Sequence, residues 1–268
     1  MSTDARAQTL AHLRLVAAHP GFWELRALHR VDGSRMEARG SFFIIATAAG
    51  DALIYDRLEQ AVDWAQHHDR NGTELFIGVN PRAREARDKS AVETVTAAFV
   101  DLDLADGESQ ESTLEQVTDG DAPLPSFVVN SGYGLHVVYL LTEPSTNKSL
   151  WRKVQRGIAR KFSELGADSK IASDESRVLR LAPYPNRKKW PAGVPTSIVY
   201  QSDARYTLAD LAAAFPVAKG TTFSTRETLT IVPDRVVDDA GDESSADRIL
   251  SRRVDLGRGY PLAPDPDG

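Results

Sequence analysis

The spacing of apolar residues divides most of the chain into short strand-like runs and a few amphipathic helices. Runs rich in Val, Ile, Leu and Phe predict strands at 21–31, 41–47, 74–80, 97–104, 125–132, 135–141, 177–182 and 196–201. Apolar residues three or four positions apart predict helices at 4–18, 55–68, 146–165 and 207–215. Asp56 is expected near the N-cap of the second of these helices, and Thr207 is expected to cap the last. The polar, acidic segment 106–123 is expected to be a loop.

Strands and helices alternate irregularly in this pattern, and several successive strands are close enough to be hairpin partners. The pattern predicts an α+β (mixed α/β) domain over 1–215, with a largely antiparallel sheet flanked by helices. It lacks the regular βαβ rhythm of a doubly wound fold. Residues 216–268 are polar and rich in Pro and Gly, so they predict a linker or the start of an accessory domain.

Composition narrows the function classes. The chain has 268 residues, of which none is cysteine, so disulfides, thiolate metal sites and cysteine nucleophiles are excluded. No apolar run is long enough for a membrane span, and the N-terminus lacks the basic start and apolar core of a signal peptide. We therefore expect a cytoplasmic protein without a membrane partner.

Charge is distributed unevenly, although the net charge is −6. Residues 151–190 contain eleven Lys or Arg against four acids, whereas 216–268 contain seven against ten. The basic segment is either a solvated helix face or a surface that binds an anion such as nucleic acid. The total charge alone does not exclude a nucleic-acid partner.

Two acids interrupt the apolar strand 97–104. Asp101 and Asp103 are two positions apart, so their side chains share one face of the strand and repel each other. They either cap the strand where it enters a loop or hold a hard divalent cation, which prefers carboxylate oxygens.

A glycine-rich turn follows, in the sequence NSGYGLHVVYLL at 130–141. Gly132 and Gly134 permit a tight turn whose N–H groups can converge on a phosphate, and Ser131 adds a hydroxyl. His136 then begins a strand. It is either a buried core residue or a ligand of the same phosphate.

Acidic and basic residues alternate in the segment 165–189. Asp168 follows the basic helix, and Arg177, Arg180 and Lys188 come after it. Arg and Lys are suited to phosphate oxygens, whereas a solvated loop with local ion pairs is the alternative. Arg82, directly after the strand 74–80, is a further candidate anion contact.

The order of these motifs resembles the archaeo-eukaryotic primase superfamily, specifically the primase–polymerase domains of phage and plasmid replication proteins. VDLDL at 100–104 is similar to the first motif of that family, and Ser131 to His136 is similar to its S-G-x-G-x-H motif. The third-motif acid corresponds to Asp168, with Asp174 as the second choice. RVLRLAPYPNRK at 177–188 resembles the trailing R-h-h-R-h-P-G-T-x-N-x-K, except that Ala-Pro-Tyr replaces P-G-T. The resemblance covers about 40–215, and the segment is similar in style to the N-terminal part of actinobacteriophage primase–helicases.

The resemblance implies a DNA primase and polymerase that joins nucleotides by two-metal catalysis. In that family Asp101, Asp103 and Asp168 would hold Mg²⁺ or Mn²⁺. The residues implied for nucleotide binding are Ser131, Gly132, Gly134, His136, Arg177, Arg180, Lys188 and Arg82. The implied partners are a single-stranded DNA template, NTP or dNTP substrates, and a helicase as a C-terminal domain or a separate protein, in a bacterial host cell. Zinc is not expected, because Cys is lacking and His67 and His68 have no partners at ligand spacing.

Three other functional classes are compatible with these residues. A metal-dependent nuclease would use the same acids, and a glycosyltransferase would use D-x-D for a nucleotide sugar. A glycosyltransferase does not account for the S-G-x-G-x-H turn. A non-catalytic replication initiator or DNA-binding module of the same fold would not need all three acids.

Overall fold

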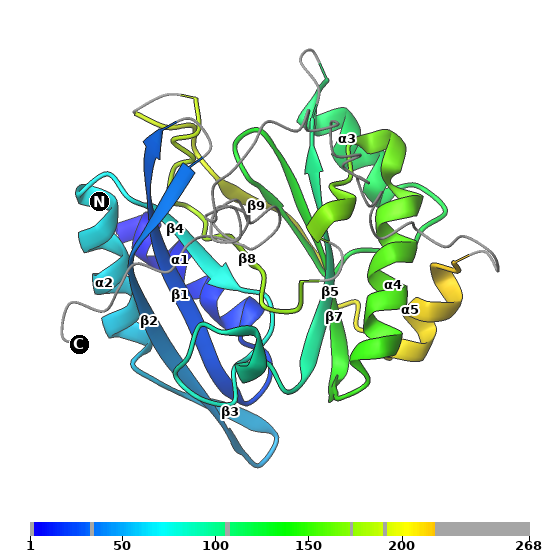
Figure 1. Cartoon of the computed structure of the whole chain (residues 1–268), viewed down its shortest axis with the longest axis horizontal. Coiled ribbons are helices and arrows are strands. Elements are labelled where there is room, and N and C mark those ends of the chain that lie inside the picture. Colours follow the sequence, from blue (N-terminus) through cyan, green and yellow to red (C-terminus); the bar gives the residue numbers. More distant parts are fainter. Residues whose placement is uncertain (1–2, 33–34, 105–107, 172–173, 190–191, 218–268) are drawn as a thin grey trace, which may run out of the picture. The chain divides into compact units, whose positions relative to one another are not determined.

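The strands form two antiparallel sheets in the computed structural model, which describes residues 3–32, 35–104, 108–171, 174–189 and 192–217 (Figure 1). Residues up to Val217 form one compact unit. The segment 216–268, expected to be a linker or accessory domain, lies outside the described residues apart from its first two positions. Its structure therefore stays a prediction.

The first sheet has the strand order β3-β2-β1-β4-β8. Its strands are β1 (Gly21–Asp32), β2 (Arg35–Ala49), β3 (Ala52–Asp56), β4 (Glu74–Gly78) and β8 (Val178–Arg180). All of its neighbouring strands are antiparallel. The chain therefore returns to this sheet near its end, and β8 brings the arginine-containing segment beside β4.

The second sheet has the order β5-β7-β6-β9 and is also antiparallel. Its strands are β5 (Val95–Asp103), β6 (Phe127–Asn130), β7 (Gly134–Ser145) and β9 (Ser197–Gln201). The predicted α+β class and antiparallel pairing are confirmed. The difference from the expectation is that the strands divide between two sheets, which periodicity within single strands does not specify.

Helices cover both sheets. Figure 1 shows α1 (Thr3–Val16) and α2 (Leu58–Arg70) against the first sheet, and α4 (Lys148–Lys161) and α5 (Leu208–Ala214) against the second. The remaining helical segments are short: α3 (Gln110–Thr118), η1 (Lys89–Ala91), η2 (Ser163–Leu165) and η3 (Ser169–Ile171). Within the described ranges, no helix has the length and apolar character that crossing a bilayer requires.

One expectation about the helices was wrong and two were confirmed. Asp56 lies next to the N-cap of α2, as expected: it ends β3 in the hairpin with β2, and Arg57, the N-cap, has a left-handed conformation (φ 60°). The predicted acidic loop contains α3, which Ser109 caps by accepting from the N–H of Ser112. Thr207 caps α5 as expected, in a capping box with Asp210.

The outer edge of β5 is paired with side chains in place of a full neighbouring strand. Asn80 Oδ1 accepts from two successive N–H groups of β5, the second being that of Ala97 (3.2 Å). Trp151 Nε1 of α4 donates to the carbonyl of Ala97 (2.7 Å), and Gln155 Oε1, one turn later, accepts from the N–H of Phe99 (2.9 Å). An edge strand needs such partners when it is buried. These bonds fix α4 along the strand that carries the two acids.

A close helix crossing provides a test of this packing. Gly157 of α4 lies against the end of α5, where an added Cβ would be 2.0 Å from the carbonyl oxygen of Phe215. Ala normally stabilises a helix relative to Gly, but here the methyl group must push the two helices apart. We expect Gly157→Ala to lower the free energy of unfolding by about 1–3 kcal/mol in urea unfolding. Arg160→Ala, on the exposed face of α4, should change it by less than about 0.5 kcal/mol. A Gly157→Ala protein that is more stable than the parent would contradict this close contact between α4 and α5.

Candidate active site

The two acids of β5 lie at the end of the strand and differ in exposure. Asp101 is 18% exposed, whereas Asp103 is 63% exposed. On one side, β7 pairs with this part of β5, and Asp101 lies opposite His136. On the other side, the N–H of Asp168 donates to the carbonyl of Asp101 (3.0 Å), next to a bridge between Leu102 and Ala167. Asp101 is therefore held between two chain segments that each carry a candidate site residue.

Asp168 is directly opposite Asp101 in this register, and opposite residues of an antiparallel pair point to the same face. Burial raises the pKa of Asp101 above its ordinary value, and the negative charge of Asp168 adds to the rise. Arg177, the strongest of the opposing charges, lowers it. Asp174, the second choice for the third acid, instead accepts from the N–H and hydroxyl of Ser176 in its own turn.

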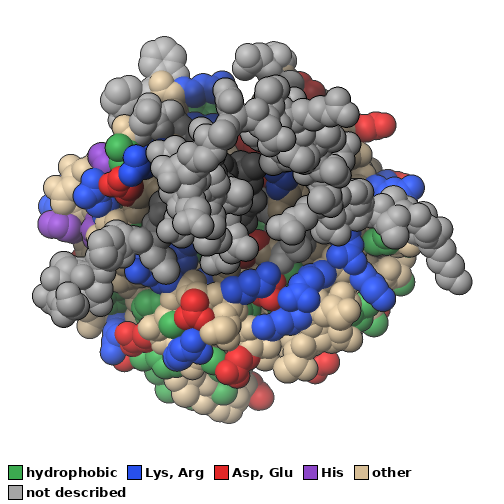
Figure 2. Space-filling view, in the orientation of Figure 1, with side chains coloured by type: hydrophobic (Ala, Val, Ile, Leu, Met, Phe, Trp, Pro, Cys, Tyr) green, Lys and Arg blue, Asp and Glu red, His purple; other side chains and the backbone are tan. Residues whose placement is uncertain are grey.

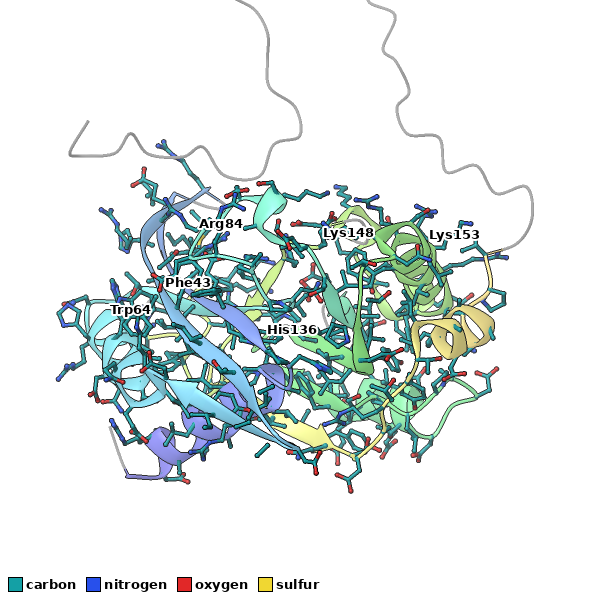
Figure 3. The ribbon with its side chains drawn as sticks, turned by 90° about the horizontal axis from the view of Figure 1, so that it is seen from below. Phe43, Trp64, Arg84, His136, Lys148 and Lys153 are labelled. Atoms are coloured by element: carbon teal, nitrogen blue, oxygen red, sulfur yellow. The ribbon has the colours of Figure 1, made fainter. Side chains whose placement is uncertain are left out.

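His136 is buried beside Asp101, with 3.5 Å between its Nε2 and the Oδ1 of Asp101. Burial lowers the pKa of His136 to about 3, and the positive charges of Arg180 and Arg177 contribute. The imidazole is therefore neutral at pH 7, and its contact with Asp101 is not an ion pair. Its Nδ1 is buried and has no hydrogen-bond partner within the described part of the chain. Figure 3 shows His136 in the interior of the unit.

Basic residues reach the acids from the first sheet and from the segment after it. Lys188 Nζ lies 3.9 Å from the Oδ1 of Asp103. Arg180, at the end of β8, and Arg177, just before that strand, both act electrostatically on Asp101. Two arginines three positions apart on one strand would face opposite ways. Both can act on Asp101 because Arg177 precedes the strand.

Arg180 is held in place by a buried carboxylate. Its Nη1 lies 2.5 Å from the Oε2 of Glu74, which also pairs with Arg30 at 2.9 Å. The guanidinium of Arg180 lies over the ring of Phe76, 4.9 Å from its centroid. Glu74 was not identified from the sequence, where the only signal is an acid at the start of an apolar strand.

The glycine-rich turn is shaped by contacts within the protein. Gly132 has φ +96°, and a Cβ there would be 2.8 Å from Cβ of Asn186. A Cβ on Gly134 would be 2.0 Å from the carbonyl oxygen of Leu102, so β7 approaches β5 too closely for any side chain. The N–H groups of Ser131 and Gly132 already donate to Gly134 and Asn130. These two groups are thus used inside the turn, contrary to the expected phosphate cradle.

Asn186 joins this turn to the basic segment. Its Nδ2 donates to the carbonyl of Ser131 (2.6 Å), and its Oδ1 accepts from the N–H of Lys188 (3.0 Å). Ser131 is itself 6% exposed. The Asn of the predicted N-x-K motif therefore positions both the serine and the lysine.

Arg82 does not line the site, which corrects its expected role in nucleotide binding. Its side chain is fully buried, and Nη2 donates to the Oε2 of Glu24 (2.9 Å) and to the carbonyl of Ser176 (2.9 Å). Asn80 Nδ2 donates to the carbonyl of Glu175 (3.1 Å). The segment after β4 therefore anchors the turn that precedes Arg177.

The side chains that the motifs assign to divalent cations are the carboxylates of Asp101, Asp103 and Asp168. Carboxylate oxygens suit Mg²⁺ and Mn²⁺, and the buried Asp101 beside Asp168 is the type of site that a cation stabilises. Among the residues that the structure describes, no three His, Cys, Asp or Glu side chains are gathered closely enough to hold a metal ion. Oδ1 of Asp168 accepts from the N–H of Lys170 (2.9 Å). The backbone register and donor chemistry fit a metal, whereas the carboxylates would have to turn toward each other to bind it.

Comparisons with known proteins identify the fold. No protein-family model and no curated protein matches the sequence. The AEP domain of the cyanophage S-2L primase-polymerase (PrimPol) is similar in structure, with a TM-score of 0.54 and 20% sequence identity, and the match covers 79% of this chain and 98% of that domain. The catalytic domain of primase RepB′, in complex with initiator DNA, has a TM-score of 0.51 and 16% identity over 78% of this chain and 95% of that one. The chain therefore has the archaeo-eukaryotic primase fold that its motifs predicted. The relation to a helicase stays a prediction.

The buried pair of Glu24 and Arg82 gives a stability test of the corrected role. Glu24→Gln leaves the buried guanidinium of Arg82 without its anion, so it should lower the free energy of unfolding by about 3–5 kcal/mol. Arg82→Met should lower it by less, about 1–3 kcal/mol, because Arg26 Nε still lies 2.7 Å from the carboxylate of Glu24. The double variant should lose less than the sum of the two. Arg84→Met, whose side chain is 55% exposed, is the control and should cost less than about 1 kcal/mol. An Arg82→Met protein as stable as the parent would contradict this placement.

The buried histidines predict how stability depends on pH. His12 Nδ1 accepts from the N–H of Ala182 (3.0 Å), and burial lowers the pKa of His12 from 6.5 to about 4. The unfolded chain thus binds more protons below pH 6.5, so the free energy of unfolding should fall as pH falls from 6.5 to 4. His12→Asn keeps an acceptor near Nδ1 and should flatten this slope in urea unfolding. His67→Asn, at an exposed position, should not. Equal slopes for His12→Asn and the parent would refute the assignment.

Proposed function

We propose that this chain is a primase–polymerase, a nucleotidyltransferase that makes and extends primers on single-stranded DNA in phage or plasmid replication. The observation that carries the proposal is the position of Asp101. Its buried carboxylate lies opposite Asp168, beside His136, and within electrostatic reach of Arg177, in a chain with the archaeo-eukaryotic primase fold. A structural framework alone has no need for this combination of a buried acid and surrounding basic groups.

Asp101, Asp103 and Asp168 would hold Mg²⁺ or Mn²⁺, which in nucleotidyl transfer activates the attacking 3′-hydroxyl and neutralises the triphosphate. The exposed Asp103 faces Lys188. A triphosphate that enters from solvent would therefore meet a carboxylate and an ammonium group at the entrance of the site. Lys188 and Arg177 are the basic groups best placed to bind phosphate oxygens. Arg180 contributes mainly its field, because Glu74 already occupies its guanidinium.

The side chains of His136 and Ser131 would orient the incoming nucleotide. A neutral imidazole carries one N–H, and Nε2 of His136 lies on the side of the acids, 3.5 Å from Oδ1 of Asp101, so it would meet one group of a substrate without adding charge. Ser131 lies at the start of the glycine-rich turn and is fixed through Asn186. NTP and dNTP are both candidate substrates, and the RepB′ complex with initiator DNA supports DNA as a partner.

Replacement of the acids tests the proposal. Asp101→Asn/Asp103→Asn and, separately, Asp168→Asn should each reduce primer synthesis by at least about a hundredfold, because the charge that would hold the cations is removed. Synthesis is measured on single-stranded DNA with Mg²⁺ or Mn²⁺, comparing NTPs with dNTPs. Thermal unfolding checks that each variant is folded. EDTA should abolish synthesis by the parent protein.

Two controls accompany this experiment. Asp121→Asn, which changes one charge on a fully exposed side chain, should retain parental synthesis. Labelled DNA incubated with metal but without nucleotides should remain intact, because degradation would indicate the nuclease alternative. Full synthesis by the Asp101→Asn/Asp103→Asn protein would refute the proposed role of the acids.

A further inference from the structure

Glu175 lies below the surface and gathers three basic side chains. It is 2% exposed, and its carboxylate lies 2.9 Å from Nη2 of Arg152, 3.0 Å from Nζ of Lys89 and 4.0 Å from Nζ of Lys148. We call these four residues the Glu175 cluster. They come from η1, from the first two turns of α4 and from the turn before Arg177.

The cations of the cluster outnumber its acid. Lys89, Lys148 and Arg152 all face the single carboxylate of Glu175. Lys89, Lys148 and Arg152 are 53%, 27% and 37% exposed, so each keeps part of its side chain toward solvent. Ion pairs with partly exposed cations contribute little stability, so a second and a third cation on one carboxylate add little to what the first pair provides. The arrangement is better suited to binding an anion with side chains that are already ordered.

The positive charge continues along α4 in one direction. Lys148, Arg152 and Arg156 are four positions apart, so they share one helix face and rise by about 6 Å from one to the next. In Figure 3, Arg84, Lys148 and Lys153 lie along one edge of the unit, and Figure 2 shows Lys and Arg side chains gathered in a band on the face toward the viewer. A linear band suits a polyanion, whereas a single triphosphate needs a pocket.

The band leads toward the candidate active site. Glu175 is two residues before Arg177, which acts on Asp101. The turn that carries both residues is fixed by bonds from Asn80 and Arg82 to the carbonyls of Glu175 and Ser176. An anion bound at the Glu175 cluster would therefore lie at a fixed position relative to the acids.

We infer that the Glu175 cluster, extended by Lys153 and Arg156, binds the phosphate backbone of the single-stranded DNA template. Glu175 is a positioning residue that orders Lys89, Lys148 and Arg152 for this contact. The contacts are to phosphates, so binding is independent of base sequence and sensitive to salt. The inference rests on the proposed function, because it assumes that the acids act on a templated strand.

Binding of a fluorescein-labelled 20-nucleotide single-stranded DNA, followed by anisotropy at several salt concentrations, tests the inference. The full chain is used with EDTA and without nucleotides. Lys148→Gln/Arg152→Gln should weaken binding by about tenfold or more and reduce the slope of log K against log salt by about 1.4, or 0.7 for each lost cation. The charge-keeping variant Lys148→Arg/Arg152→Lys should bind within about twofold of the parent.

The matched control changes two cations elsewhere. Arg35→Gln/Arg39→Gln removes the same charge from exposed positions of β2 and should leave both affinity and slope within error of the parent. Equal losses in this control would overturn the inference, because they would indicate only an effect of net charge. Unchanged DNA binding by Lys148→Gln/Arg152→Gln would also overturn it, as would a rise in nucleotide KM without loss of DNA affinity.

The binding assay is independent of catalysis. If the parent protein binds DNA through Lys148 and Arg152 but makes no strand, the proposed function fails while the binding surface stands. If the acids prove essential for synthesis while the Gln variant binds normally, the function stands and the surface is wrong. Thermal unfolding of each variant separates either outcome from misfolding.

Discussion

The open edge of β5 is the constraint on which the rest of the site depends. A buried edge strand must find partners for its N–H and C=O groups, and here the partners come from several distant segments. Asn80 serves the beginning of the strand, Trp151 and Gln155 of α4 serve the middle, and the segment 166–168 serves the end. Satisfying these backbone groups therefore places the loop after β4, the basic helix and Asp168 around the two acids.

Buried carboxylates of the first sheet provide a second level of organisation. Glu74 holds Arg180, and Glu24 holds Arg82, which in turn fixes the turn before Arg177. Each pair is shielded from water, so its geometry is far better defined than that of a surface ion pair. The positions of Arg177 and Arg180, whose charges act on Asp101, are thus set by residues that do not themselves line the site.

The sequence was most informative where chemistry depends on local spacing. The i, i+2 rule placed Asp101 and Asp103 on one face, and the order of the motifs indicated the fold before any contact was known. Arg82 shows the limit, since its charge suggested an anion site while its partner Glu24 lies 58 positions away. The helix α3 was missed because its polar composition concealed a narrow buried face formed by Thr113 and Val117. Long-range pairing and weak amphipathicity leave little trace in local patterns.

The short bridge between β5 and the segment after α4 depends on a glycine for its register. Gly166 approaches so closely that a Cβ would be 2.1 Å from the carbonyl oxygen of Asp103, which fixes the start of the bridge. Side chains alternate faces along such a segment, so a slip of one residue in the register would present Ala167 or Ser169 in place of Asp168. Such a slip would also bring Leu165 or Ala167, each with a Cβ, to the position that only a glycine fits. Gly166 therefore locks the register that keeps the three acids on one face.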